Sequence, residues 1–154
     1  MTRPTKDQYY LSIAKAVSMR STCLRRHYGA VLVKNDIILS SGYNGSARGD
    51  INCCDTGFCA RETEGAPHNS GYLDSCPAIH AEANCLLNVN RQDAIGATLY
   101  LYGYDCIKKE PVVPAEPCIM CKRLIQNCGI SRVVGYGSEP DIKERPGEPK
   151  IMYR

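Results

Sequence analysis

The chain has 154 residues, which is enough for one domain that buries about two-thirds of its unfolded surface. A net charge of +3 is too small to indicate a nucleic-acid-binding surface, and no long apolar run predicts a membrane span or a signal peptide. We therefore expect a single domain over residues 1–154, located in the cytoplasm, with neither a membrane nor a nucleic acid as its partner.

The first part of the chain predicts a helix followed by a β-hairpin. Apolar residues recur at helical spacing between residues 5 and 19, and Thr5 and Gln8 occupy the positions of a capping box. Residues 28–33 and 36–41 are rich in Val, Ile and Leu and flank a short polar turn, which is typical of two paired strands.

Residues 42–77 form a long segment rich in Gly, Cys, Asn and Asp, without helical or strand periodicity. So long a loop is unusual inside a compact domain, and such loops are commonly functional, disordered or held together by a metal. We interpret this segment as a Cys-rich loop.

The second half of the chain predicts two helices and two strands. Helices are expected at 79–88 and 117–128, and strands at 97–102 and 131–136. The element order is then α-β-β-α-β-α-β, which indicates a layered α/β domain. Residues 103–116 contain lysines and prolines that favour an inserted loop over a helix.

Two short motifs in this half carry the chemistry. His80-Ala81-Glu82 begins one expected helix, and Pro117-Cys118-Ile119-Met120-Cys121 begins the other. One imidazole and two thiolates can hold zinc and leave its fourth position to water. Zinc lowers the pKa of that water to about 7, and a carboxylate beside it can move protons. We therefore predict a catalytic zinc held by His80, Cys118 and Cys121, with Glu82 as the catalytic acid and base.

Each motif alone has other interpretations. A Cys-x-x-Cys pair also occurs in structural zinc sites and in redox pairs. A structural site takes a fourth protein ligand and has no use for Glu82, so the combined motif favours a catalytic zinc. Because both motifs lie at expected helix starts, the backbone N–H groups and the helix dipole there favour thiolate over thiol.

Ten cysteines are an unusually high number for this length. A disulfide framework is typical of short secreted chains, and without a targeting signal reduced thiols and metal ligands are the better interpretation. Cys85 and Cys128 fall on apolar helix faces, where cysteine is commonly a small buried residue. Beyond the two in the Cys-x-x-Cys motif, the cysteines still to be explained are Cys23, Cys53, Cys54, Cys59, Cys76 and Cys106.

The zinc motifs resemble those of the cytidine and deoxycytidylate deaminase superfamily, and the chain most closely resembles the deoxycytidylate (dCMP) deaminases. The resemblance implies a three-layer α/β/α sandwich around a mixed sheet of about five strands. Only four strands are evident, so we expect the fifth near residues 150–153. The resemblance is carried by Arg26-His27-Tyr28-Gly29-Ala30-Val31-Leu32-Val33, Ser41-Gly42-Tyr43-Asn44-Gly45-Ser46-Ala47-Arg48-Gly49, Ile79-His80-Ala81-Glu82-Ala83-Asn84 and Pro117-Cys118-Ile119-Met120-Cys121.

This family implies hydrolysis of dCMP to dUMP and ammonia, a reaction that feeds thymidylate synthesis. Water attacks C4 of the cytosine ring, Glu82 protonates N3 and then the leaving amine, and the backbone N–H of Ala81 steadies the new oxygen. Asn44 resembles the family asparagine that binds the sugar, although Tyr-Asn-Gly is also a strong turn signal. Arg48, in the same Gly-rich segment, is a candidate for the phosphate.

The resemblance also implies a second, structural zinc. Asn52-Cys53-Cys54-Asp55 is similar to the Asn-Cys-Cys-Asp of bacteriophage dCMP deaminases, which carry such a zinc, and Cys23 matches a further ligand position. A closed site of this kind would hold the Cys-rich loop together. The alternative is a set of thiols without metal. The candidate ligands are Cys23, Cys53, Cys59, His68 and Cys76.

Further expectations concern partners and substrate. The family implies a homo-oligomer, and in several members the Gly-Tyr-Asn-Gly loop, here residues 42–45, takes part in binding dCTP as activator and dTTP as inhibitor. The insertion at 103–116 departs from the family pattern and leaves the exact substrate open. The alternatives are deamination of cytidine or deoxycytidine, of tRNA adenosine or of a riboflavin-pathway pyrimidine, and a non-catalytic nucleotide-binding protein held together by zinc.

Overall fold

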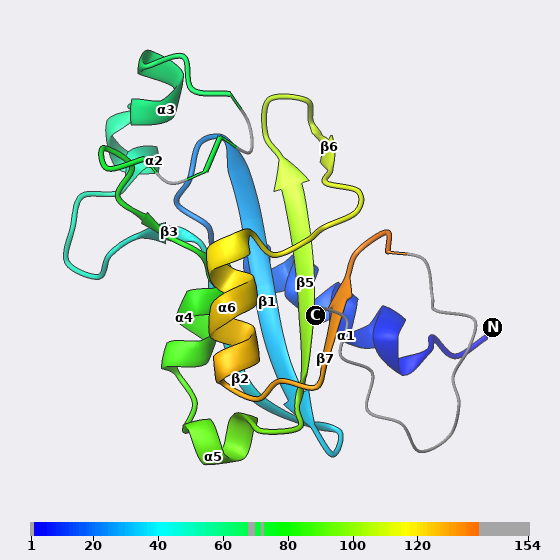
Figure 1. The fold of residues 1–154 in the computed structure, drawn as a ribbon. Coiled ribbons are helices and arrows are strands. Elements are labelled where there is room, and N and C mark those ends of the chain that lie inside the picture. The colour runs from blue at the N-terminus through cyan, green and yellow to red at the C-terminus, as the bar shows by residue number, and fades with distance from the viewer. Residues whose placement is uncertain (1, 68–69, 72, 139–154) are drawn as a thin grey trace.

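A mixed sheet of five strands forms the centre of the molecule (Figure 1). The structure, a computed structural model, describes residues 2–67, 70–71 and 73–138. Within these residues, none of the helices combines the length and the hydrophobicity that crossing a bilayer requires. In chain order the elements are α1 (Lys6–Ser18), β1 (Arg26–Lys34), β2 (Ile37–Tyr43), β3 (Gly45–Ser46), α2 (Cys53–Thr56), α3 (Ala60–Thr63), β4 (Ala78–Ile79), α4 (Ala81–Leu87), α5 (Arg91–Ala94), β5 (Thr98–Asp105), β6 (Glu110–Pro111), α6 (Ile119–Asn127) and β7 (Arg132–Gly135).

The strand order in the main sheet is β2-β1-β5-β6, and β7 also pairs with β5. β1 is antiparallel to both β2 and β5, β6 is antiparallel to the end of β5, and β7 runs parallel to β5. The expected mixed sheet of five strands is therefore confirmed. The strand expected near residues 150–153 lies outside the described residues, and the fifth strand of this sheet is β6, which sequence reasoning did not foresee. It also did not foresee the short pair β3 and β4, and α4 begins at Ala81 and not at Ile79, which belongs to β4.

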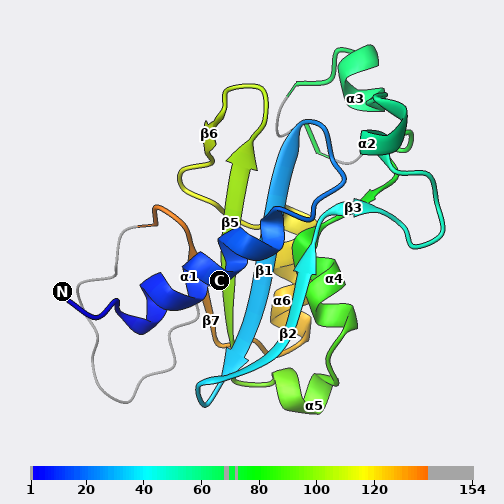
Figure 2. The ribbon, with the colours of Figure 1, turned by 180° about the vertical axis from the view of Figure 1, so that it is seen from behind.

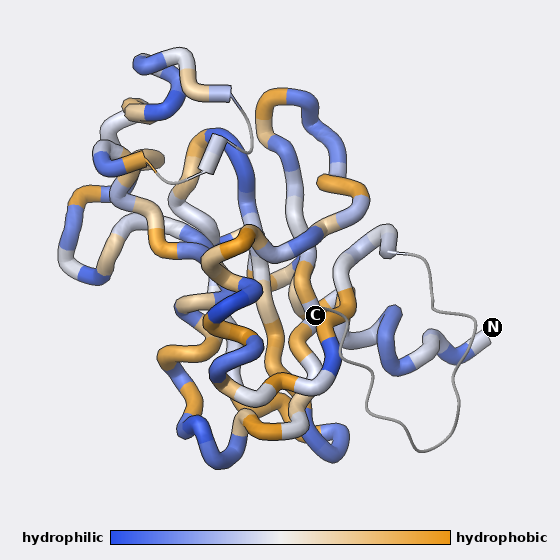
Figure 3. The backbone as a smooth tube through the Cα atoms, viewed as in Figure 1, coloured by the Kyte–Doolittle hydropathy of each residue, from blue (hydrophilic) through white to orange (hydrophobic). Residues whose placement is uncertain are grey.

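Alternation along the two central strands gives the sheet two apolar faces. Ala30 and Leu32 of β1 and Leu101 of β5 pack against α4 and α6. The alternate residues, among them Val31 and Tyr100, pack against α1. Figures 1 and 2 show α4 and α6 on one side of the sheet and α1 on the other, which confirms the three-layer arrangement. In Figure 3 the hydrophobic colour runs along the central strands, where the two cores lie.

Local signals in the N-terminal part act as the sequence predicts. The backbone N–H of Gln8 donates to the Thr5 hydroxyl at 3.2 Å, and the Gln8 side chain accepts from the Thr5 backbone at 2.9 Å. This capping box begins α1. Asn35 and Asp36 have φ angles of 52° and 60°, which is the left-handed conformation that suits a tight hairpin turn.

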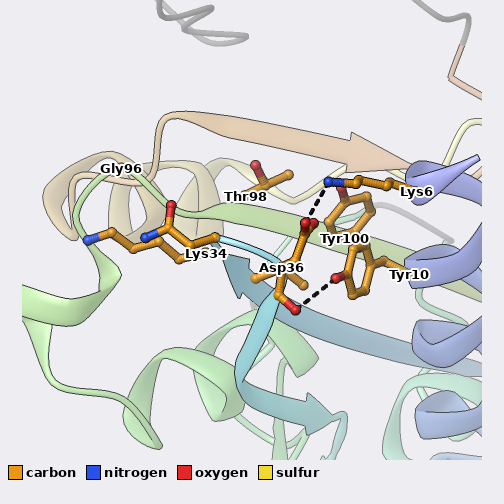
Figure 4. Close-up of a pocket in the computed structure, with 9 residues that line it drawn as sticks. Lys6, Tyr10, Lys34, Asp36, Gly96, Thr98 and Tyr100 are labelled. Atoms are coloured by element: carbon orange, nitrogen blue, oxygen red, sulfur yellow. Dashed lines mark hydrogen bonds and ion pairs between the residues drawn. The ribbon is translucent and has the colours of Figure 1, made fainter.

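A polar pocket of about 280 Å³ lies beside this hairpin turn (Figure 4). Lys6 of α1 forms an ion pair of 2.6 Å with Asp36, and the Tyr10 hydroxyl donates to the Asp36 backbone oxygen at 3.2 Å. These contacts attach α1 to the turn. No cysteine or histidine lines the pocket, which lies at the opposite end of the sheet from the starts of α4 and α6. The pocket is therefore separate from the predicted catalytic residues.

Two segments expected to be loops contain secondary structure. Residues 42–77 include the end of β2, the short strand β3 and the short helices α2 and α3. Residues 103–116 include the end of β5 and the strand β6. The end of β5 is extended because Asp105 pairs with Arg26 of β1 on one side and with Glu110 of β6 on the other. Such pairing between distant residues leaves no periodicity in the local sequence.

Candidate zinc centre and active site

The N-termini of α4 and α6 meet on one face of the sheet (Figure 1). His80 is the N-cap residue of α4, Cys118 is the N-cap residue of α6, and Cys121 lies in the first turn of α6. The His80 Nδ1 atom lies 3.4 Å from the Cys118 Sγ atom and 3.4 Å from the Cys121 Sγ atom. All three atoms lie within 4.8 Å of one another. The structure thus brings together the three predicted zinc ligands.

Hydrogen bonds within this cluster favour a thiolate at Cys118. A hydrogen bond from Cys121, followed in strength by one from His80, lowers the pKa of Cys118 to about 3. The same bond to Cys118 raises the pKa of Cys121, and a bond to Cys118 raises the pKa of His80. The backbone N–H of Cys121 also donates to Cys118 Sγ at 3.5 Å. The cluster therefore presents at least one sulfur in the ionised form that binds metals.

The donor set fits zinc. One imidazole nitrogen and two thiolate sulfurs are ligands that zinc prefers, and zinc is most often tetrahedral. Among the described residues, no fourth His, Cys, Asp or Glu joins the three within this distance. Three protein ligands and an open fourth position are typical of a catalytic site, whereas a structural zinc site usually has four protein ligands.

Glu82 lies beside the three ligands in the first turn of α4 and is only 4% exposed. Burial raises the pKa of its carboxyl group, while a hydrogen bond from its own backbone N–H opposes the shift. The Cys121 thiol is also within hydrogen-bonding reach of the carboxylate. A buried carboxyl group whose pKa is raised can accept and return a proton near neutral pH, as an acid–base catalyst must.

The position of α4 depends on Gly42 in β2. A Cβ atom at Gly42 would lie 2.3 Å from the backbone nitrogen of Cys85 and 2.5 Å from the backbone oxygen of Ala81. Any side chain at this position therefore forces α4 away from the sheet. The absence of a side chain at Gly42 allows α4, which carries Glu82, to pack directly on β2.

Tyr28 of β1 lies within reach of the charge of Glu82. Its ring occupies the space above Gly103, its partner in β5, where a Cβ atom would lie 2.5 Å from the ring. The Tyr28 hydroxyl bonds to Arg26, whose guanidinium pairs with the buried Asp105 at 3.4 Å. Burial raises the pKa of Tyr28, and the nearby charge of Glu82 adds to the shift. No sequence signal could have revealed this contact, because it depends on the register between β1 and β5.

Asn44 makes several bonds to the backbone around it. Its Oδ1 atom accepts from the Tyr28 backbone N–H at 2.8 Å and from the Ser21 hydroxyl at 2.6 Å. Its Nδ2 atom donates to the Arg26 backbone oxygen at 2.9 Å. Asn44 therefore joins the end of β2 to the start of β1, and it is only 7% exposed. Its predicted contact with a sugar stays a prediction.

The remaining predicted substrate contacts, Ala81 and Arg48, differ in their exposure to solvent. Ala81 is the first residue of α4 and is fully buried, so its backbone N–H belongs to the helix start at the zinc ligands. Arg48 is exposed in the turn after β3. Sequence reasoning missed a different arginine, Arg61 of α3, whose positive charge opposes the raised pKa of His80.

Three of the other candidates for a second zinc, Cys23, Cys59 and Cys76, act electrostatically on Cys53. Burial raises the pKa of Cys53, and charge interactions with Cys23, Cys59 and Cys76 raise it further. Among the described residues they do not form a group of three within 4.8 Å, as the ligands at α4 and α6 do. His68 lies outside the described residues. The second zinc stays a prediction.

Three zinc ligands, an open fourth position and a buried carboxylate two residues from the imidazole are together typical of few classes of enzyme. Zinc-dependent hydrolytic deaminases of nucleobases combine all of these. The model of the cytidine and deoxycytidylate deaminase zinc-binding region matches residues 4–136. The chain belongs to this family.

Relatives of the chain include phage and yeast proteins. The deoxycytidylate deaminase of Mycobacterium phage D29 is 44% identical over 138 residues, which cover 87% of this chain and 96% of the phage protein. The deoxycytidylate deaminase of Schizosaccharomyces pombe is 35% identical over 136 residues, which cover 88% of this chain but 38% of the yeast protein. The dCMP deaminase of cyanophage S-TIM5 shares the fold with a TM-score of 0.58 and 25% identity, covering 86% of this chain and 82% of the cyanophage chain.

Proposed function

We propose that this chain hydrolyses dCMP to dUMP and ammonia. The observation that carries the proposal is the approach of His80 to both Cys118 and Cys121, with Glu82 buried beside them. The names of the relatives support dCMP as the substrate, because the proteins of phage D29 and fission yeast are deoxycytidylate deaminases. The S-TIM5 enzyme also has a solved structure in complex with dCMP and dUMP.

His80, Cys118 and Cys121 hold the zinc ion in this proposal. When bound, zinc supplies a Lewis acid that lets a water molecule ionise near pH 7. Glu82 accepts the first proton of this water and delivers it to N3 of the cytosine ring as the water oxygen bonds to C4. Glu82 then carries the second proton of the water to the amine on C4. The C4–N bond breaks, ammonia leaves and a C4 carbonyl remains, so one water is consumed for each ammonia released.

The predicted substrate contacts can each serve this reaction. The backbone N–H of Ala81 lies at the N-terminus of α4, where helical N–H groups have no partner within the helix, and it steadies the oxygen at C4. Asn44 contacts the sugar through the second hydrogen of its Nδ2 group, since its first goes to Arg26. Arg48 supplies a positive charge for the phosphate from the turn after β3.

A second, structural zinc is part of the same proposal. The backbone N–H of Arg25 donates to the Cys23 Sγ atom at 3.4 Å, much as the backbone N–H of Cys121 donates to Cys118 at 3.5 Å. Each of these two sulfurs thus accepts a hydrogen bond from a nearby backbone N–H. In the proposed site, Cys23 and Cys53 provide two of the four ligands. Two of the three remaining candidates, which are Cys59, His68 and Cys76, provide the other two.

Assembly and regulation are further parts of the proposal. Several apolar side chains on α4 and α6 are exposed, which supports a homo-oligomer: Leu87, Ile119, Met120 and Leu124. In such an assembly the loop at residues 42–45 binds dCTP as activator and dTTP as inhibitor. All ten cysteines are free, which supports a reducing compartment such as the cytoplasm.

A substrate panel tests the proposed function. Purified zinc-loaded protein is incubated with dCMP, CMP, deoxycytidine and dCTP, each with and without low concentrations of dCTP or dTTP, and ammonia release is followed. We expect turnover that is selective for dCMP, with faster rates in dCTP and slower rates in dTTP. Turnover of deoxycytidine at the same kcat/KM as dCMP would contradict the proposal, as would a zinc-loaded protein that leaves dCMP unchanged.

A further inference from the structure

The segment before β1 is bonded to the start of α2. The backbone oxygen of Thr22 accepts a hydrogen bond from the backbone N–H of Cys54 at 3.1 Å. Cys53 is the first residue of α2, and Cys23 directly follows Thr22 in the chain. Two of the predicted ligands of the second zinc therefore lie on segments that are bonded to each other.

The short pair of β3 and β4 lies against the same segment. The backbone N–H of Ser46 donates to the Thr22 hydroxyl at 3.3 Å, and Ser46 pairs with Ala78 of β4. Cys76 precedes Ala78 by two residues. This pair therefore brings a third candidate ligand toward Thr22.

The side chain of Arg25 joins the segment before β1 to α3. Its Nε atom lies 2.7 Å from a carboxylate oxygen of Glu62, which lies in the first turn of α3. Cys59 is the N-cap residue of that helix. The backbone N–H of Arg25 donates to the Cys23 Sγ atom at 3.4 Å. Arg25 therefore links Cys23 to the helix that begins at Cys59, and Figures 1 and 2 show α2, α3 and β3 beside the start of β1.

Two buried side-chain atoms on these segments have no hydrogen-bond partner. They are Nη1 of Arg25 and Oγ of Ser46, and no other buried side-chain nitrogen or oxygen among the described residues is in this state. Glu62 pairs with Nε of Arg25 and leaves Nη1 without an acceptor, although the side chain is only 6% exposed. A buried donor without a partner lowers stability, so each of these atoms calls for an acceptor.

The sulfurs of a zinc site supply such acceptors. Cys23 and Cys53 give two thiolates, and any two of the three other candidates add at least one more, because only one of the three is a histidine. Three thiolates on a zinc ion leave a net negative charge, which is costly to bury without a nearby cation. Hydrogen bonds to the ligand atoms also orient them and strengthen metal binding. The unpaired donors of Arg25 and Ser46 therefore fit this site.

We propose that the Arg25 guanidinium and the Ser46 hydroxyl donate hydrogen bonds to the cysteine sulfurs of the second zinc site, and that Arg25 balances their negative charge. The inference rests on the second zinc of the proposed function. Arg25 is then a positioning residue, which acts on the ion through the thiolates and does not touch it.

The affinity of the second zinc ion tests this assignment. The zinc-loaded full chain is titrated with a chelator, and the zinc that stays bound per chain is measured. For Arg25→Gln we expect the affinity of the second ion to fall about 10- to 100-fold, the range for a lost hydrogen bond to a metal ligand. Arg25→Lys keeps the charge and should lose less. The same titration of Cys53→Ser identifies the ion at α4 and α6, which should keep its wild-type affinity in the Arg25 variants.

Glu62→Gln separates donation to sulfur from the attachment of α3. This change removes the ion pair but leaves the positive charge of Arg25 in place. We expect the second ion to bind at least as tightly as in the wild type, because Glu62 no longer competes for the guanidinium. An equal loss of affinity in Arg25→Gln and Glu62→Gln would overturn the inference, since attachment of α3 would then explain both. Arg132→Gln, which breaks the pair with Asp7, is the control for a general loss of stability and should leave both ions at wild-type affinity.

Ser46→Ala is a smaller change that tests the same inference if Arg25→Gln does not fold. It should weaken the second ion alone, and wild-type affinity in every foldable variant of Arg25 and Ser46 would overturn the inference. A wild type that binds one zinc ion per chain would overturn it too, whether or not that protein deaminates dCMP. A wild type that binds two ions without deaminating dCMP would refute the proposed reaction instead, and the affinities of the variants would still decide the role of Arg25.

Discussion

Arg132 donates two hydrogen bonds to the carboxylate of Asp7, from Nη1 to Oδ1 at 2.9 Å and from Nη2 to Oδ2 at 2.5 Å. Asp7 lies in the first turn of α1, and Arg132 begins β7, which lies 125 positions further along the chain. The hydrogen bond with Arg132 lowers the pKa of Asp7, although partial burial opposes the shift. This pair joins α1 to the last strand of the sheet.

Asp7→Asn should therefore lower stability in a pH-dependent way. The pKa of Asp7 in the folded state lies below its ordinary value of 3.8, so its carboxylate stabilises the fold fully above that value. The stabilisation is lost as the pH falls through the lowered pKa. Urea unfolding from pH 7 down to pH 3 should show a gap between wild type and variant that narrows below pH 4. A gap that is independent of pH would contradict this explanation. Asp36→Asn, which removes the exposed pair with Lys6, should cost less at pH 7.

Glu82→Gln should abolish most turnover while leaving zinc in place. Glutamine keeps the size and a hydrogen-bonding group but cannot accept and return a proton. General acid–base catalysis contributes about 10²- to 10⁴-fold, so kcat for dCMP should fall by that factor. Metal analysis should give the wild-type zinc content, because Glu82 is not among the three clustered ligands. Glu110→Gln, an exposed change on β6, serves as the control, and a kcat within a few-fold of wild type for Glu82→Gln would refute the mechanism.

Gly42→Ala should damage both stability and activity. The new Cβ atom meets backbone atoms of α4 at 2.3 and 2.5 Å, so the helix that carries Glu82 must move. Overpacking of this kind costs about 1–3 kcal/mol of unfolding free energy. We expect a lower melting temperature and a lower kcat in the same protein. The neighbouring change Ser41→Ala affects an exposed side chain and should alter neither; a fully active Gly42→Ala would show that α4 tolerates displacement.

Asn44→Ala separates a structural role from a contact with the sugar. The change leaves the backbone N–H of Tyr28 and the backbone oxygen of Arg26 without their side-chain partner. An unsatisfied buried group costs about 1–3 kcal/mol, so chemical denaturation should show a clear loss of stability. Asn44→Asp keeps the acceptor for Tyr28 and should be less destabilised. Wild-type stability combined with a raised KM for dCMP would instead assign Asn44 to substrate binding alone.

Cys53→Ser should reveal the second zinc. If Cys23 and Cys53 hold a structural ion, the wild type contains two zinc ions per chain and Cys53→Ser contains one, with a lower melting temperature and retained turnover. Cys54→Ser is the matched control, because Cys54 is the adjacent, exposed cysteine and was not predicted as a ligand. A wild type that binds one zinc ion, or equal zinc content in the two variants, would refute the second site.

Local features of the sequence predicted much of the scaffold. Thr5 and Gln8 form the capping box within one turn of helix, and Asn35 and Asp36 form the hairpin turn, so each signal acts over a few residues. The strand β6 and the end of β5 were missed because Asp105 is extended by pairing with Arg26, which is 79 positions away in the chain. The periodicity of the local sequence carries no information about a pairing partner so far away in the chain.

The three predicted zinc ligands and Glu82 could be selected from the sequence alone, because zinc chemistry demands particular residue types at short spacings, and the structure places them at two helix starts. Only the tertiary structure brought Tyr28 within reach of the charge of Glu82, and His80 within reach of the charge of Arg61. These contacts depend on strand register, on the close approach of α4 to Gly42 and on the Arg25–Glu62 ion pair. The sequence by itself indicated the class of reaction. The tertiary structure decided which side chains surround the site, because packing brings together residues that no local pattern connects.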